Sequence, residues 1–353
     1  MNNKYWSELT KKINPYTPGE QPQDKKYVKL NTNENPYPPS PKVFEAVKKV
    51  SESSLKLYPD PDSNILKQAI ASYYKIDKSF IFTGNGSDEV LAFCYPAFFN
   101  YDKPVLFPDI TYSFLPVFAS LFNIKIETIS LTDDFSINIS DYKRPNTGII
   151  IPNPNAPTGR YLELDLIREI LKFNQNSIVI IDEAYIDFGG ESAIKLVESY
   201  PNLLVVQTLS KSKSLAGLRL GFAVGQPELI EAMNRIKSSF NSYTIDRLCS
   251  AGAAAAFEDA EYYNQISLKI INTREDAVKE LSKLGFYIIP SKSNFLFVKH
   301  SVFNAEKLYI LLKQNGVLVR YFKKPRIDNY LRITIGTKEE MEVLYRTIKT
   351  IIL

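Results

Sequence analysis

The chain has 353 residues, of which 44% are hydrophobic and 23% charged, and its formal net charge is +4. This length and composition predict a soluble globular protein with two domains and a large core. Basic and acidic residues are interleaved and histidine occurs once, which argues against nucleic-acid binding, His-based metal sites and Ser-His-Asp triads.

The N-terminus and the cysteines indicate the cellular compartment. Residues 1–6 lack the apolar core of a signal sequence, and no stretch approaches the ~18 apolar residues of a membrane span. Cys94 and Cys249 lie far apart in apolar surroundings, which is typical of buried, reduced thiols. We therefore expect a cytoplasmic protein that has no membrane partner and binds no metal.

Residues 1–40 are rich in proline, asparagine and tyrosine, which predicts an extended N-terminal arm that packs with the smaller domain. From 41 to 258, short apolar runs alternate with helical patterns such as Leu162–Phe173. This alternation predicts a large α/β domain whose mostly parallel seven-stranded sheet is covered on both faces. The strands are expected at Ile81–Thr83, Val105–Phe107, Ile124–Ile129, Ile149–Ile151, Ile178–Ile181, Leu203–Thr208 and Leu220–Val224.

The pattern changes in residues 259–353, which we expect to form a smaller α+β domain. A long charged helix is predicted at about 261–284, with further helices between and after the strands. Strand-like runs occur at Tyr287–Ile289, Phe295–Val298, Val317–Tyr321 and Leu331–Ile335.

Several polar side chains follow the predicted strands of the large domain. They are Asn155, Asp182 and Tyr185, then Lys211 and Arg219 in the run TLSKSKSLAGLRLG at residues 208–221. Ligands of open α/β sheets bind at the carboxyl ends of the strands, so we expect these side chains at one site. Their order resembles the pyridoxal-phosphate-dependent aminotransferases of fold type I.

Lys211 is the candidate for the Schiff base with pyridoxal 5'-phosphate. A free lysine is a poor nucleophile at neutral pH, but one with perturbed surroundings can react. Lys213 and Lys237 compete with it, and each is interpreted as an ordinary surface charge. Only Lys211 has a serine directly before it and an arginine eight residues after it, at the end of a strand.

The cofactor phosphate needs charged and backbone donors. Ser210 and Arg219 are expected to bind it, together with Thr208. Gly86, Ser87 and Asp88 belong to a strand, glycine turn and capped helix start, which is a ready anion site. A dinucleotide fingerprint is the rival interpretation, and it fails because Glu89 stands where the third glycine belongs.

The cofactor ring needs an acid and hydrogen-bond donors. A buried carboxylate requires a partner, and Asp182 is expected to pair with the pyridinium nitrogen. Glu183 beside it is an alternative acid, and the two carboxylates could instead bind a metal. Tyr185 and Asn155 are expected to hydrogen-bond the phenolic oxygen, while Tyr112 either stacks on the ring or is an ordinary core aromatic.

Further motifs narrow the resemblance. The segments NPYTPG (14–19), LNTNENP (30–36), LYPD (57–60) and LRITIGT (331–337) are similar to the histidinol-phosphate aminotransferases. The resemblance covers nearly the whole chain. Two departures are Ala156, where many relatives carry a second asparagine, and Gln207, where an arginine is common.

The resemblance implies further roles. Tyr58 would reach the cofactor phosphate of the partner subunit in a homodimer with shared active sites. Arg320 and Arg332 would bind the anionic group of the substrate, with Tyr16 and Asn33 nearby. From its sequence alone, Arg332 could equally be an exposed strand arginine.

The implied reaction, a step in histidine biosynthesis, is reversible amino transfer between L-histidinol phosphate and 2-oxoglutarate. Lys211 would anchor the cofactor and then act as general base and acid. Two enzymes of the same fold remain alternatives, a phosphothreonine decarboxylase and a broad aromatic or branched-chain aminotransferase. A non-catalytic regulator would carry an N-terminal DNA-binding module, for which the arm leaves no room.

Overall fold

A computed structural model describes residues 4–53, 55–100 and 102–352. Its larger sheet has seven strands in the order β2-β8-β7-β6-β5-β3-β4. Strand β8 is antiparallel to both of its neighbours, β2 and β7, and the other described pairs are parallel, so the predicted mostly parallel α/β sheet is confirmed. The strands are β2 (Ile81–Asn85), β3 (Val105–Pro108), β4 (Ile126–Ile129), β5 (Gly148–Pro152), β6 (Ile178–Asp182), β7 (Leu203–Thr208) and β8 (Leu220–Gly225).

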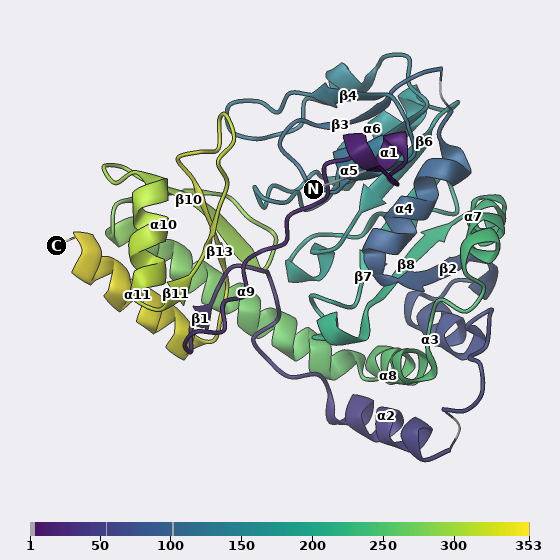
Figure 1. Ribbon diagram of the computed structural model, residues 1–353, viewed down its shortest axis with the longest axis horizontal. Coiled ribbons are helices and arrows are strands. Elements are labelled where there is room, and N and C mark those ends of the chain that lie inside the picture. The colour runs from purple at the N-terminus through teal and green to yellow at the C-terminus, as the bar shows by residue number, and fades with distance from the viewer. Residues whose placement is uncertain (1–3, 54, 101, 353) are drawn as a thin grey trace.

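Helices cover both faces of this sheet (Figure 1). Alternate residues of one strand point to opposite faces, so Ile149 packs into one buried cluster and Ile150 into another. The first cluster includes residues of α3 (Asn64–Tyr74), α6 (Leu164–Phe173) and α8 (Arg247–Glu258). The second includes residues of α4 (Gly86–Phe98), α5 (Leu115–Leu121) and α7 (Pro227–Phe240). Burial on both sides explains why the central strands are continuous apolar runs.

A second sheet is antiparallel and has four strands in the order β12-β13-β10-β9. Its strands are β9 (Phe286–Ile289), β10 (Phe295–His300), β12 (Arg320–Tyr321) and β13 (Leu331–Thr334). Leu296, Val298 and Ile333 form a separate buried cluster with residues of α9 (Ala260–Lys283), α10 (Ala305–Gln314) and α11 (Lys338–Ile352). Helix α9 runs from the larger sheet to this second unit (Figure 1).

One predicted strand, Val317–Tyr321, is two short strands in the structure. The first half, β11 (Val317–Leu318), pairs in parallel with β1 (Val28–Lys29), whereas β12 pairs with β13. The chain changes partners at the buried Val319. The hydrophobic pattern continues through this change, so the sequence could not reveal it.

The N-terminal region also differs from a fully extended arm. It contains a short helix, α1 (Glu8–Lys12), whose N-cap Ser7 accepts a hydrogen bond from Thr10 N. Helix α1 buries no residue, so the sequence contains no periodic pattern of apolar residues that would predict it. Helix α2 (Pro41–Ser53) follows the arm.

The described residues lack two features. None of their helices combines the length and apolar character required to cross a bilayer. They also include no cluster of three or more His, Cys, Asp or Glu side chains that could hold a metal ion.

Candidate active site

A cavity of about 270 Å³ lies where the carboxyl ends of β6 and β7 approach the N-terminal arm and the second sheet. It brings together most of the residues that the sequence singled out. Those that line it are Tyr16, Asn33, Ser87, Asp88, Tyr112, Asp182, Tyr185, Thr208, Ser210, Lys211, Arg219, Arg320 and Arg332.

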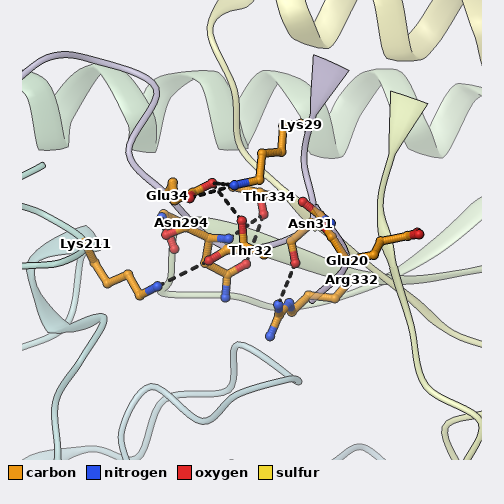
Figure 2. A network of polar contacts seen from close by, with 10 residues as sticks. Glu20, Lys29, Asn31, Thr32, Glu34, Lys211, Asn294, Arg332 and Thr334 are labelled. Atoms are coloured by element: carbon orange, nitrogen blue, oxygen red, sulfur yellow. Dashed lines mark hydrogen bonds and ion pairs between the residues drawn. The ribbon is translucent and has the colours of Figure 1, made fainter. Parts of the chain in front are cut away.

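Lys211 follows β7 and points toward the N-terminal arm (Figure 2). Its Nζ donates to the backbone oxygen of Thr32 at 3.3 Å, and its own backbone oxygen accepts from Asn35 Nδ2 at 3.0 Å. Burial and the nearby Arg332 lower the pKa of Lys211 to about 8. An amine with this pKa is partly neutral at physiological pH, as a nucleophile or base must be.

Asp182 is the last residue of β6 and is buried. It accepts a hydrogen bond from Ala184 N at 3.2 Å, and burial raises its pKa to about 7. The neighbouring Glu183 accepts instead from Ser192 Oγ and Ala193 N, both at 2.6 Å, and does not line the cavity. Of the two carboxylates, Asp182 is thus the one that can meet a cationic ligand.

Tyr185 is held by the N-terminal arm. Asn33 Nδ2 donates to Tyr185 Oη at 3.0 Å, while Thr334 Oγ1 donates to Asn33 Oδ1 at 3.0 Å. Asn33 has a positive φ of 57°, which asparagine tolerates better than most residues. The phenol of Tyr185 is therefore held at the cavity by Asn33 of the arm, which Thr334 of β13 supports in turn.

Hydroxyl and cationic groups gather at the start of α4. The hydroxyl groups of Thr208 and Ser210 lie 3.0 Å apart, and Arg219 Nη2 lies 3.3 Å from Asp88 Oδ2. Ser87 stands in the first turn of α4, where free backbone N–H groups favour an anion. This end of the cavity suits a phosphate.

Gly221 on β8 allows the start of α4 to approach the sheet. A Cβ atom at this position would lie 2.2 Å from Ser87 N, which is far inside van der Waals contact. Sequence reasoning gave Gly221 no role. Its position two residues after Arg219 could have indicated a close approach of the backbone near the site. Gly86 has a φ of +80° and does not line the cavity, but it lies directly against the Arg219 guanidinium.

Aromatic side chains form one wall. Tyr112 Oη donates to Asp88 Oδ1 at 2.7 Å, and burial together with Asp88 raises the pKa of Tyr112. Tyr16 stacks on Phe114 with ring centroids 4.3 Å apart, and its centroid lies 6.2 Å from that of Tyr112. The N-terminal arm thus closes over the site from the side of α5.

Two arginines stand at the other end of the cavity. Arg332 Nη2 donates to Asn31 O at 2.9 Å (Figure 2), and Arg320 donates to the backbone oxygens of Thr17 and Pro18, both at 3.4 Å. Neither guanidinium forms an ion pair with a carboxylate within the described part of the chain. Two cations that are not neutralised in this way suit an anionic ligand.

Asn155 and Tyr58 lie outside the cavity lining. The amide of Asn155 donates to Ile110 O at 2.9 Å and to Thr158 Oγ1 at 3.0 Å, so it faces protein partners rather than a ring oxygen. The backbone N–H of Asn155 also donates to Arg160 O at 2.8 Å, which closes a turn. Tyr58 is 76% exposed and stacks on Tyr243 at 4.7 Å.

Sequence reasoning missed most of the support that residues 31–35 give. This run was noticed as a motif, but only Asn33 received a role. In the structure, Asn31 and Thr32 hold Arg332 and Lys211 through their backbone oxygens, which no side-chain pattern can signal.

The chain and its fold are similar to those of known proteins. Residues 25–348 match the family "Aminotransferase class I and II", and the chain belongs to this family. It is a pyridoxal-phosphate-dependent aminotransferase of fold type I, as the sequence predicted.

Individual relatives narrow the comparison. The chain is 56% identical over 349 residues to a histidinol-phosphate aminotransferase from Clostridium botulinum, covering 99% of each chain. It is 57% identical over 346 residues to the enzyme of that name from Clostridium acetobutylicum, covering 98% of each. The fold matches histidinol-phosphate aminotransferase from Sinorhizobium meliloti, solved with pyridoxal 5'-phosphate, with a TM-score of 0.88, 22% identity and 98% coverage of both chains.

Proposed function

We propose that the protein transfers an amino group between L-histidinol phosphate and 2-oxoglutarate, as a step of histidine biosynthesis. The observation that carries the proposal is the pair Arg320 and Arg332, which lack carboxylate partners among the described residues and share one cavity with Lys211. The names of its relatives, which are more than half identical to this chain, point to the same substrate.

The cavity fits pyridoxal 5'-phosphate because it offers a different partner to each of its functional groups. Ser210, Arg219 and the N–H groups that start α4 would hold the phosphate. Asp182, a buried carboxylate, would hold the ring nitrogen in its protonated form. When bound, the cofactor supplies an aldehyde that reacts with amines and a ring that accepts electrons from the carbon that loses its proton.

The remaining chemistry belongs to the chain. Lys211 would anchor the cofactor and, once displaced by the substrate amine, take the proton from the substrate's Cα on its Nζ. Thr32 O is placed to hold the lysine after displacement, since it accepts from Nζ at 3.3 Å. Tyr185 would donate to the ring oxygen, and Tyr112 would cover the ring face.

The same arginines would serve both half-reactions. L-histidinol phosphate carries a phosphate and no carboxylate, whereas glutamate carries two carboxylates. Arg320 and Arg332 present planar guanidinium groups that bind either anion with two parallel hydrogen bonds. Tyr16 and Asn33 would complete this end of the cavity.

A substrate panel on the purified, cofactor-loaded protein tests the proposal through the cofactor spectrum in single half-reactions. Histidinol phosphate should react far faster than histidinol or phenylalanine. Arg332→Ala should remove a contact of about 1.5–3 kcal/mol and lower kcat/KM at least about tenfold. Equal rates with phosphorylated and unphosphorylated amines would contradict the proposal, and release of carbon dioxide from phosphothreonine would identify a decarboxylase.

We further infer a homodimer with shared sites. Leu57, Tyr58, Phe240 and Tyr243 expose 56, 76, 79 and 44% of their surface, and apolar surface of this kind marks interaction sites. The stacked Tyr58 and Tyr243 join the two segments into one patch, to which Arg247 adds hydrogen bonds to the backbone oxygens of residues 57 and 58. A second copy covering this patch would bring Tyr58 to the cofactor phosphate of the other site.

A division into an arm (1–40), a large cofactor-binding domain (41–258) and a small domain (259–353) completes the proposal. It is supported by the separate buried clusters around the two sheets and by the pairing of β1 with β11, which joins the arm to the small domain.

A further inference from the structure

The two arginines that we propose bind the substrate anion are direct cross-strand neighbours. Arg320 on β12 stands opposite Arg332 on β13 in the antiparallel register. Like charges in directly opposed positions of a sheet repel each other and destabilise it. Something must therefore hold these two guanidinium groups together when no anion lies between them.

Few hydrogen bonds hold these two guanidinium groups. Arg320 reaches its two backbone acceptors only at 3.4 Å, near the upper limit for a hydrogen bond. Arg332 has one hydrogen bond, from Nη2, and its buried Nε has no partner among the described residues.

Phe322, the first residue after β12, lies against both arginines. The centre of its ring is 5.6 Å from the guanidinium carbon of Arg320 and 5.6 Å from that of Arg332. These distances are within the range of cation–π attraction. Phe295 provides Arg332 with a second ring at 5.3 Å, whereas Phe322 is the ring that the two arginines share.

Phe322 is itself fixed in place. It packs against a buried cluster that draws residues from both sides of the cavity, namely Ile110, Leu131, Phe135, Ile289, Phe297, Ile327 and Tyr330. The ring also lines the cavity. The ring of Phe322 is therefore packed on the protein on one side and lies near the two guanidinium groups.

We propose that Phe322 is a positioning residue that holds Arg320 and Arg332 together as one anion-binding unit and so sets the preference for a phosphorylated amine. The inference rests on the proposed function, because it explains how the two arginines recognise the phosphate. The electron-rich ring face offsets part of the repulsion between the cations and keeps both in place before the substrate arrives.

The test compares Phe322→Leu with Phe322→Tyr in the cofactor-loaded enzyme. Leucine keeps an apolar side chain without a ring, whereas tyrosine keeps the ring. Loss of both cation–π contacts should lower kcat/KM for histidinol phosphate about tenfold, mainly through KM, and leave that for histidinol within about twofold. In Phe322→Tyr, the ratio of kcat/KM for histidinol phosphate to kcat/KM for histidinol should equal that of the wild type.

A matched control is Tyr321→Leu. Tyr321 is the adjacent aromatic residue of β12, and its ring stacks on Tyr309 at 5.8 Å instead of on the arginines. This variant should leave the substrate ratio unchanged. Inorganic phosphate, used as a competitive inhibitor, gives a second readout, and its inhibition constant should rise about tenfold in Phe322→Leu only.

The outcomes separate the two proposals. If the wild-type enzyme does not prefer histidinol phosphate over histidinol, the proposed function fails. If the wild type has the preference and Phe322→Leu keeps both it and the phosphate inhibition constant, the role of Phe322 is refuted. Should Phe322→Leu not fold, as judged by thermal unfolding, Phe322→Met provides the same comparison.

Discussion

Lys211 and Lys213 are separated by one residue, yet their ammonium groups have different surroundings. Lys213 is buried, so its interpretation as an ordinary surface charge was wrong, and its Nζ lies 5.0 Å from the ring centres of both Tyr73 and Tyr263. Lys211 instead lines the cavity. Of these two lysines, only Lys211 can reach a ligand in the cavity, although each directly follows a serine in the sequence.

This difference predicts where the cofactor is attached. Borohydride reduction of the loaded protein, followed by peptide mapping, should place the label on Lys211. Lys213→Met should still be labelled, whereas Lys211→Ala should not. A label on Lys213 would overturn the assignment of the anchoring lysine.

Asp182 predicts a pH dependence of stability in the cofactor-free protein. Burial raises its pKa to about 7 in the folded state, above its unfolded value of 3.8. The folded state therefore retains a proton that the unfolded state loses. The contribution of Asp182 to the free energy of unfolding is thus fully present below about pH 4 and is lost as the pH rises toward 7. Asp182→Asn removes the titrating group and should reduce this fall by an amount on the order of a few kcal/mol.

Chemical denaturation of the cofactor-free wild type and Asp182→Asn at pH 4 and pH 8 measures the effect. Glu183→Gln is the matched comparison, because burial also raises the pKa of Glu183 to about 7. Of the two variants, only Asp182→Asn should lower the affinity for pyridoxal 5'-phosphate. An equal effect of the two variants on cofactor affinity would show that Asp182 does not face the ring.

At the scale of elements, the contact between β8 and the start of α4 builds the end of the cavity that we propose binds the cofactor phosphate. Gly221→Ala would place a methyl group against the backbone of residues 86 and 87. We expect a loss of about 1–3 kcal/mol in the free energy of unfolding, since backbone must shift to relieve the clash. The affinity for pyridoxal 5'-phosphate should fall with it, because the N–H groups of α4 move.

Gly217→Ala is the control for this variant. Gly217 lies in the same β7–β8 connection, but a Cβ atom there would meet nothing within 4 Å. Cofactor affinity, measured by equilibrium dialysis, should be unchanged in Gly217→Ala. Unchanged affinity in Gly221→Ala as well would mean that the start of α4 is not part of the phosphate site.

The elements themselves were largely predictable. The strands of the larger sheet were expected from their apolar runs, and β5, β6 and β7 carry that pattern along their whole length because both of their faces are buried. Pairing partners were not predictable, as the division of Val317–Tyr321 shows. Short pieces such as α1 and β1 were missed because they bury too few residues to create a periodic signal.

The site was predictable to the extent that side-chain chemistry determined it. Lys211, Asp182 and Arg219 stand at strand ends, where the topology of an open sheet places ligands. Asn155 also follows a strand, but the direction of its amide depends on hydrogen bonds within the turn. Phe322 was missed because no sequence pattern shows that one ring faces two arginines.

At the scale of the whole molecule, shared sites predict complementation between subunits. If each site combines Lys211 with Tyr58 of the partner subunit, a heterodimer of Lys211→Ala and Tyr58→Ala chains has one doubly defective and one intact site. Mixing the two impaired homodimers and allowing subunit exchange should then recover activity, approaching one working site per heterodimer. Mass spectrometry of tagged chains verifies the exchange.

Unrecovered activity after verified exchange would show that Tyr58 acts within its own chain or has no role in the site. The matched control replaces Tyr58→Ala with Asp182→Ala, since Asp182 and Lys211 line one cavity of one chain. Chains carrying Lys211→Ala and Asp182→Ala should not complement each other.

The cytoplasmic location expected from the sequence stays a prediction.

The arm also has a consequence for the size of the substrate. Lys211 and Arg332 are bound by the backbone oxygens of Thr32 and Asn31, which are consecutive residues (Figure 2). Consecutive Cα atoms are separated by a fixed distance of about 3.8 Å, and the peptide between them is planar. One peptide unit therefore connects the contact to Lys211, the proposed reacting amine, with the contact to Arg332, the proposed anion-binding group. Under the proposed function, we therefore expect a longer homologue of the substrate to fit less well while both hydrogen bonds remain formed.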